Sequence, residues 1–238
     1  MKRFSNQHLV LMPGLDGTGL SFEPILPFLP ADAKITIVRY PTDKLLSFAE
    51  TVECAAAQIP EGKHPIVIAE SFSGPVAIQM IGSGRIKAKA LVLCATFAKS
   101  PRPIVWRLMR FLRLPLLIRP DMPKRFFKIV IGDDKLIAKL LPLWKKVHTG
   151  VPARVMNHRL KIINNVDVTK WLKKLHVPCC YLQATNDRVI PSSCLADFES
   201  CIPNLEIKTI KSPHFILQAQ PQACLDAIEE FISTTSSA

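Results

Sequence analysis

The stretch from Ile66 to Pro75 constrains the fold of this chain most strongly. It reads IVIAESFSGP: an apolar run ends at a single hydroxyl, Ser71, and a segment of helical character follows. This is the pattern of a buried strand, a sharp turn and a helix. A serine in that turn holds its oxygen above the edge of a sheet, and the backbone N–H of Phe72 points toward the same space. The stretch therefore predicts a nucleophile beside an oxyanion donor.

The residues around Ser71 depart from the usual G-x-S-x-G spelling of this turn, because they read A-E-S-F-S. Ala69 and Ser73 are still small enough for a tight turn. The same residues also fit a strand-to-helix loop without chemistry. The hypothesis of a nucleophile therefore depends on partners elsewhere in the chain.

Short apolar runs alternate with segments of helical period along most of the sequence. The alternation predicts a doubly wound α/β fold, with a mostly parallel sheet of about six strands covered on both faces. We expect strands at residues 8–12, 34–40, 66–69, 88–95, 179–184 and 205–210. We expect helices near residues 20–29, 46–59, 77–81, 167–175, 192–200 and 221–232.

The alternation stops between residues 98 and 165, where the sequence has helical period, many prolines and no clear strand. We interpret this segment as a helical cap, or lid, inserted after the fourth strand into a core of residues 1–97 and 166–238. The chain has a net charge of +12, and residues 101–161 carry that whole excess with fifteen Lys and Arg against three Asp. The cap is therefore strongly basic, whereas the charges of the core balance.

Composition excludes several classes of protein. With 238 residues and 48% hydrophobic residues, the chain can bury the core of one sizeable domain. No stretch approaches the roughly 20 apolar residues of a membrane span, and the apolar run near the N-terminus is too short for a signal peptide, so we expect a cytoplasmic protein. The seven cysteines lie mostly in apolar runs, which favours small core residues over disulfides or a zinc site. We expect no metal and no cofactor.

Two further residues follow strands as Ser71 does. The carboxyl ends of parallel strands meet at one edge of the sheet. Asp187 comes after the strand at 179–184, and His214 after the strand at 205–210. The order Ser, Asp, His is that of one of the convergent serine triads. We predict that His214 takes the proton of Ser71 and that Asp187 orients the imidazole.

Other candidates for these roles are weaker. Asp167 is a displaced alternative to Asp187, and we interpret Glu70 and Asp16 as turn or surface carboxylates. Five histidines precede strands or lie in the inserted segment, and we interpret them as surface or structural residues: His8, His64, His148, His158 and His176.

The loop after the first strand, PGLDGTG, can approach the same edge of the sheet. We predict that the N–H of Leu15 is the second oxyanion donor, beside that of Phe72. The alternative is a phosphate-binding loop built on Gly14, Gly17 and Gly19. The loop matches neither G-x-x-x-x-G-K-[ST] nor G-x-G-x-x-G, so nucleotide binding is disfavoured.

Four segments together resemble the α/β-hydrolases of the small carboxylesterase, lipase or thioesterase kind: LVLMPGLDGTG, IAESFSGP, NDRVIP and SPHFILQAQP. The departures are Pro13, where many relatives have histidine, and the two residues Ala69 and Ser73. The resemblance implies a lid after the fourth strand. It also implies a serine hydrolase that cleaves a carboxylic ester or thioester of a small acyl substrate through an acyl-enzyme on Ser71. The alternatives are acyl transfer on the same triad and a non-catalytic binding module with this fold.

Residues 104–118 read IVWRLMRFLRLPLLI and predict a lid helix with one apolar and one cationic face. We expect the apolar face to contact substrate through Trp106, Met109 and Phe111. The cationic face carries Arg107, Arg110 and Arg113. These arginines are either solvated or dock an acidic acyl carrier protein or an anionic membrane surface. No nucleic-acid-binding module accompanies the charge, so no nucleic acid is expected as a partner.

Overall fold

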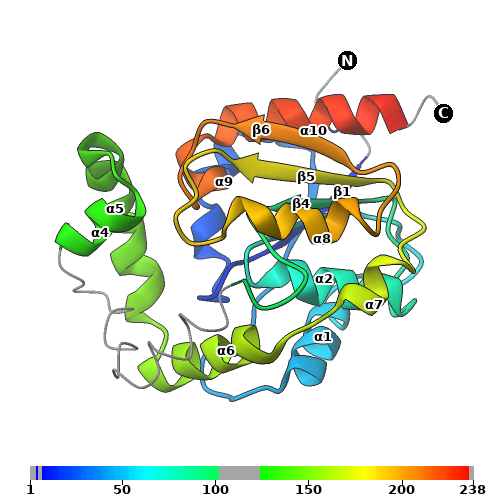
Figure 1. The fold of residues 1–238 in the computed structure, drawn as a ribbon, viewed down its shortest axis with the longest axis horizontal. Coiled ribbons are helices and arrows are strands. Elements are labelled where there is room, and N and C mark those ends of the chain that lie inside the picture. The colour runs from blue at the N-terminus through cyan, green and yellow to red at the C-terminus, as the bar shows by residue number, and fades with distance from the viewer. Residues whose placement is uncertain (1–3, 5–6, 102–123, 236–238) are drawn as a thin grey trace.

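The computed structural model describes residue 4 and residues 7–101 and 124–235 (Figure 1). Its described part forms a parallel six-stranded sheet in the order β2-β1-β3-β4-β5-β6. The predicted α/β class is therefore confirmed. The strands are β1 (His8–Met12), β2 (Lys34–Ile37), β3 (Ile66–Glu70), β4 (Ala90–Cys94), β5 (Cys179–Ala184) and β6 (Glu206–Ile210).

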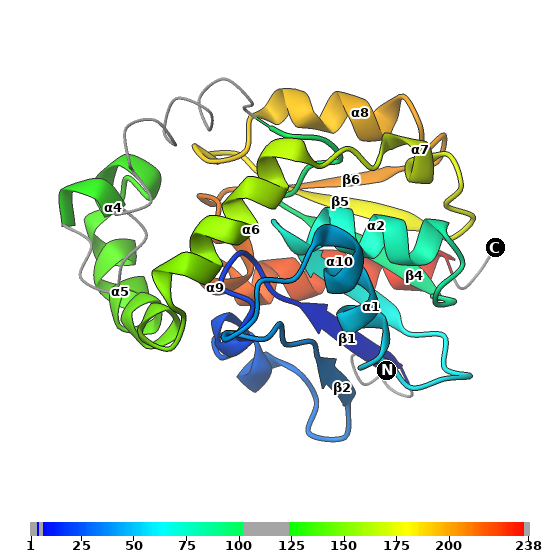
Figure 2. The ribbon, with the colours of Figure 1, turned by 90° about the horizontal axis from the view of Figure 1, so that it is seen from below.

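Helices cover both faces of the sheet. The central strands β3 and β4 are therefore buried along their whole length. One face packs against α1 (Phe48–Ala56), α2 (Ser73–Gly82), α7 (Thr169–Leu172) and α8 (Leu195–Glu199). The other packs against η1 (Leu20–Phe22), α9 (Ile216–Ala219) and α10 (Pro221–Thr235). Seen from below, α1 and α2 lie in front of the strands and α10 behind them (Figure 2).

Three helices lie between β4 and β5 in the chain: α4 (Lys124–Val130), α5 (Asp134–Thr149) and α6 (Ala153–Asn165). Helices α4 and α5 stand beyond the end of the sheet toward which the arrowheads of β5 and β6 point (Figure 1). They form a small apolar cluster of their own around Phe127, Ile131, Ile137 and Leu140. The division into a core and a cap at residues 98 and 165 stays a prediction.

Some elements differ from the sequence prediction. The helix expected at 20–29 is two short 3-10 turns, η1 and η2 (Leu26–Phe28), because Pro24 and Pro27 lack the N–H that an α-helix needs. The second strand ends at Ile37 rather than Tyr40, whose N–H instead donates to the carbonyl of Gly17 at 2.8 Å. The helix expected at 167–175 is only one turn, α7, and the sequence did not predict the short helix α9. A one-turn helix carries too few residues for a periodic signal.

The remaining helices and strands match their prediction to within a few residues. Helix α1 begins at Phe48 because Ser47 and Glu50 form a capping box, each side chain accepting from the other's backbone N–H. Short connecting elements complete the chain: η4 (Ser192–Cys194) leads directly into α8. Among the described residues, no helix is long and apolar enough to cross a membrane.

Candidate active site

Ser71 occupies a strained turn between β3 and α2. Its φ is +49°, in the left-handed region that residues other than glycine rarely adopt. Three hydrogen bonds hold this conformation: Ser71 N–H donates to Cys94 O at 3.0 Å, and Ser71 O accepts from Gly74 N–H at 3.0 Å and from Thr96 Oγ1 at 2.5 Å. The predicted strand, turn and helix around Ser71 are therefore present.

The two residues after Phe72 explain the departure from the usual spelling. A Cβ on Gly74 would lie 2.0 Å from Thr96 Oγ1, so the close approach falls one position later than in G-x-S-x-G. Ser73 has a different task. Its buried hydroxyl donates to the carbonyl of Pro13 and pairs with the Tyr40 hydroxyl at 2.7 Å. Ser73 thus fastens the loop after β1 to the turn that carries Ser71.

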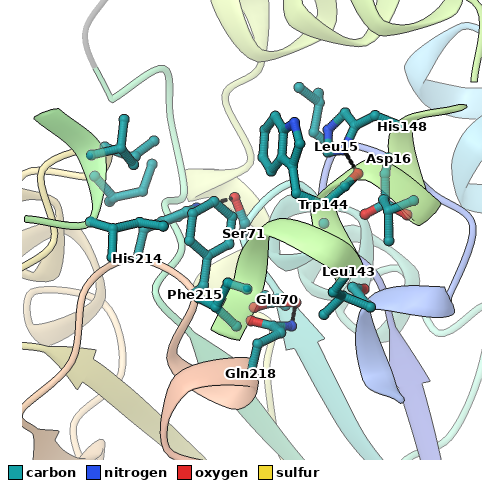
Figure 3. A pocket seen from close by; sticks show the side chains of 18 of the residues that line it. Leu15, Asp16, Glu70, Ser71, Leu143, Trp144, His148, His214, Phe215 and Gln218 are labelled. Atoms are coloured by element: carbon teal, nitrogen blue, oxygen red, sulfur yellow. Dashed lines mark hydrogen bonds between the residues drawn. The ribbon is translucent and has the colours of Figure 1, made fainter. Parts of the chain in front are cut away.

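The structure brings Ser71, Asp187 and His214 together at the carboxyl edge of the sheet. Figure 3 shows Ser71 and His214 beside each other. His214 Nε2 lies 3.0 Å from Ser71 Oγ, and its Nδ1 lies 2.8 Å from Asp187 Oδ2. The carboxyl of Asp187 is held in this orientation, because its Oδ1 accepts hydrogen bonds from the N–H groups of Val189 and Ile190, both at 2.8 Å. The carboxylate fixes the imidazole hydrogen on Nδ1, which leaves Nε2 to accept the proton of the serine.

The electrostatic environment of His214 favours its role as a base that can carry a proton. The side chain is 7% exposed, and burial alone would lower its pKa. The charge of Asp187 and its hydrogen bond to the imidazole outweigh burial and raise the pKa of His214. Asp187 therefore stabilises the imidazolium that forms when His214 takes a proton.

The proposed oxyanion donors, the N–H groups of Leu15 and Phe72, have no hydrogen-bond acceptor among the described residues. Leu15 lines the same cavity as Ser71, and Phe72 directly follows Ser71, so unpaired N–H groups at these two positions suit a bound anion. The sequence did not single out Arg159 of α6, which donates to the carbonyls of Leu15 (2.9 Å), Asp16 and Pro41 (2.9 Å). The sequence pattern that could have pointed to Arg159 is its position four residues after Val155 and four before Ile163, on the apolar face of α6.

Comparison with known proteins identifies the fold. No protein-family model matches the sequence, and no curated protein matches it. Solved structures do match over nearly the whole chain. MenH from S. aureus has a TM-score of 0.80 at 15% identity and covers 97% of this chain and 95% of its own. The bromoperoxidase from Bacillus anthracis has a TM-score of 0.78 at 14% identity, with 95% and 92% covered.

The enol-lactonase from Burkholderia xenovorans LB400 has a TM-score of 0.75 at 12% identity, with 98% of this chain and 94% of that chain covered. This chain has the α/β-hydrolase fold. At such low identities the likeness settles the architecture, and the chemistry has to be argued from the site itself.

A cavity of about 220 Å³ adjoins Ser71 and His214. Its walls are mostly apolar and come from the inserted helices α4 and α5 as well as from the core. Phe127, Ile131, Leu140 and Trp144 are among the lining residues that the insertion contributes. The predicted lid residues, both the apolar and the cationic ones, lie outside the described residues: Trp106, Met109, Phe111, Arg107, Arg110 and Arg113.

A few polar side chains also line this apolar cavity. Asp16 is a turn residue, as predicted, because it accepts from the N–H (2.8 Å) and the hydroxyl (2.5 Å) of Thr18. The interpretation of Glu70 as a turn or surface carboxylate was wrong. Glu70 is the last residue of β3, is 4% exposed and accepts from Gln218 at 3.0 Å. Strand β3 is central in the sheet, so its end is covered from both faces.

The other candidate residues have structural contacts. Asp167 accepts from the backbone and hydroxyl of Thr169, so it is occupied away from His214. His148 lines the cavity but stacks on Trp144 with ring centroids 3.6 Å apart. His8 pairs with Thr36, and His158 pairs with the carbonyl of Leu46. Among the described residues, no three His, Cys, Asp or Glu side chains gather as a metal site.

Proposed function

We propose that the chain is a serine hydrolase that cleaves a carboxylic ester or thioester of an apolar acyl group. The observation that carries the proposal is the unbroken series of hydrogen bonds from Asp187 through His214 to Ser71, at the wall of an apolar cavity. Nucleophile, base and orienting acid each have the partner that their role requires.

The first half of the reaction forms the acyl-enzyme. His214 Nε2 takes the proton of Ser71 Oγ as the oxygen bonds to the carbonyl carbon of the substrate. The electron pair of the C=O bond moves to its oxygen, and the N–H groups of Leu15 and Phe72 hold this oxyanion. The intermediate then expels the alcohol or thiol, which receives its proton from His214.

The second half returns the enzyme to its starting state. His214 takes a proton from water while the water oxygen bonds to the acyl carbon. The new intermediate releases the carboxylic acid, and Ser71 Oγ regains its proton from His214. Asp187 keeps its hydrogen bond to His214 and stabilises the imidazolium of each step.

The cavity supports an apolar acyl group as the substrate class. Its lining is predominantly aromatic and aliphatic, and such walls bind apolar substrate surface by excluding water. Two of the structural neighbours have names in keeping with esters, an enol-lactonase and a lipase-esterase related protein from Clostridium acetobutylicum ATCC 824. Those names describe the neighbours, and for this chain the ester remains our proposal.

A fluorophosphonate probe tests the mechanism directly, because it bonds covalently to an activated serine. We expect the protein to be labelled, Ser71→Ala to lose the label, and the exposed serine variant Ser200→Ala to keep it. We also expect aryl esters to yield free carboxylic acid in proportion to the phenol released. Labelling that survives Ser71→Ala would contradict the mechanism. A folded protein that is never labelled would favour a binding module.

A further inference from the structure

Glu70 and Gln218 form a second link between the two segments that carry the nucleophile and the base. Glu70 directly precedes Ser71, and Gln218 lies in α9, four residues after His214. Gln218 Nε2 donates to Glu70 Oε2 at 3.0 Å, and the two side chains are 3% and 4% exposed. Figure 3 shows the amide and the carboxyl facing each other beside Ser71.

The amide oxygen of Gln218 is unpaired within the described part of the chain. Gln218 Oε1 is buried and accepts no hydrogen bond from any described residue. An unpaired buried acceptor costs the free energy of its lost hydration. A carboxylate has no hydrogen to offer, whereas a protonated carboxyl has one O–H. An acid and a primary amide can then pair through two parallel hydrogen bonds, with Glu70 as donor in one and acceptor in the other.

The surroundings of Glu70 disfavour a negative charge. The titratable groups that act on it or feel its charge are Asp16 after β1, Cys94 in β4, His214 after β6 and Cys224 in α10. Burial raises the pKa of Glu70 to about 7, although the Gln218 hydrogen bond and His214 act in the opposite direction. A carboxylate beside Ser71 would also oppose the oxyanion that forms during the proposed reaction.

We propose that Glu70 is protonated in the folded protein, closes a cyclic pair with Gln218 and thereby positions Ser71 against His214. Glu70 is a positioning residue, since it acts through the segments that carry the two reacting groups. The effect on rate rests on the serine hydrolase activity proposed above. The protonation state of Glu70 does not, so it is tested without substrate.

Thermodynamic linkage gives that test. Glu70→Gln reproduces the neutral acid, because its amide can donate to Gln218 Oε1 and accept from Nε2. The native protein holds a proton on Glu70 that the unfolded chain releases near its ordinary pKa of 4.5. Stability from this group is therefore complete below pH 4.5 and is lost as the pH rises through about 7.

We expect the free energy of unfolding of the unmodified protein to fall relative to that of Glu70→Gln between pH 5 and pH 8. A difference that stays constant over this range would show that Glu70 is already ionised in the folded protein, and would overturn the proposal. Urea unfolding at each pH measures the difference. The exposed amide–carboxyl pair of Gln222 and Asp226, 2.9 Å apart, supplies the control Asp226→Asn, for which we expect no such trend.

Kinetics test the positioning role. We expect Glu70→Leu to lower kcat by about tenfold or more, because small displacements of reacting groups cost that much, and Glu70→Gln to recover most of the loss. The ratio of kcat for Glu70→Gln to that of the unmodified protein should rise from pH 6 to pH 8.5, as ionisation of Glu70 breaks the pair. Equal loss in Glu70→Gln and Glu70→Leu would overturn the proposal. If Glu70→Leu does not fold, Glu70→Gln and the pH ratio still decide it.

Discussion

At the scale of single residues, the turn around Ser71 needs a residue without a side chain at one tight contact, and this residue does not have to stand where G-x-S-x-G has its second glycine. The position that must lack a Cβ is Gly74, because Thr96 stands against it and its hydroxyl is held by the carbonyl of Ser71. Ser73 can therefore carry a hydroxyl, which donates to the carbonyl of Pro13 and holds the loop after β1. The two departures from the usual spelling are thus compatible with the same turn.

We expect Gly74→Ala to destabilise the fold by roughly 1–3 kcal/mol, the usual cost of overpacking a tight core. The added methyl would collide with Thr96, which cannot move without losing its hydrogen bond to Ser71. Urea unfolding measures the change. Gly150→Ala is the matched control, since its φ is −86° and no atom lies within 4 Å of the added methyl. Equal stability of Gly74→Ala and the unmodified protein would contradict the packing argument.

At the scale of elements, helix α6 is joined to the oxyanion loop by one buried side chain. Arg159 is 5% exposed, and it donates to three carbonyls, two of them in the loop after β1. Gly17 leaves room for the guanidinium, because a Cβ there would lie 2.5 Å from Nη1. A planar group with several donors in fixed directions is needed to reach three carbonyls at once. The inserted helices therefore help to shape the proposed oxyanion site.

We expect Arg159→Met to lower kcat by about tenfold to a hundredfold, with a smaller effect on KM, because the loop that carries Leu15 loses its support. Arg159→Lys should recover little, since an ammonium lacks the forked donors. Arg154→Met, on the exposed part of the same helix, serves as the control. Steady-state kinetics with an aryl ester measure the change. Full activity in Arg159→Met would contradict this role.

At the scale of the whole molecule, the net charge of +12 is concentrated in residues 101–161. Helices α4 and α5 of this segment stand beyond the end of the sheet that carries the site (Figure 1). A field of this kind speeds the approach of an anionic partner and is screened by salt. We keep the proposal that this region docks an acidic acyl carrier protein or an anionic membrane surface. The three arginines singled out for docking lie outside the described residues.

We expect kcat/KM for an acyl group on an acidic carrier protein to fall steeply between low and physiological salt, because screening weakens the steering. A small uncharged ester should be nearly indifferent to salt and is the matched control substrate. Reversing the charge of Arg107, Arg110 and Arg113 together should weaken only the reaction with the carrier. Unchanged turnover of the carrier-bound substrate in that variant would contradict docking through these residues.

The amino-acid sequence by itself determined the parallel sheet, the alternation of strands and helices along the chain, and the three residues Ser71, Asp187 and His214. Strand patterns are local, and in a parallel sheet every strand delivers the residue that follows it to the same edge. Only the tertiary structure decided the pairing of Glu70 with Gln218, the hydrogen bonds of Ser73 and the placement of Arg159. Those contacts join segments far apart in the chain, and no local pattern encodes which side chain packing will bring opposite another.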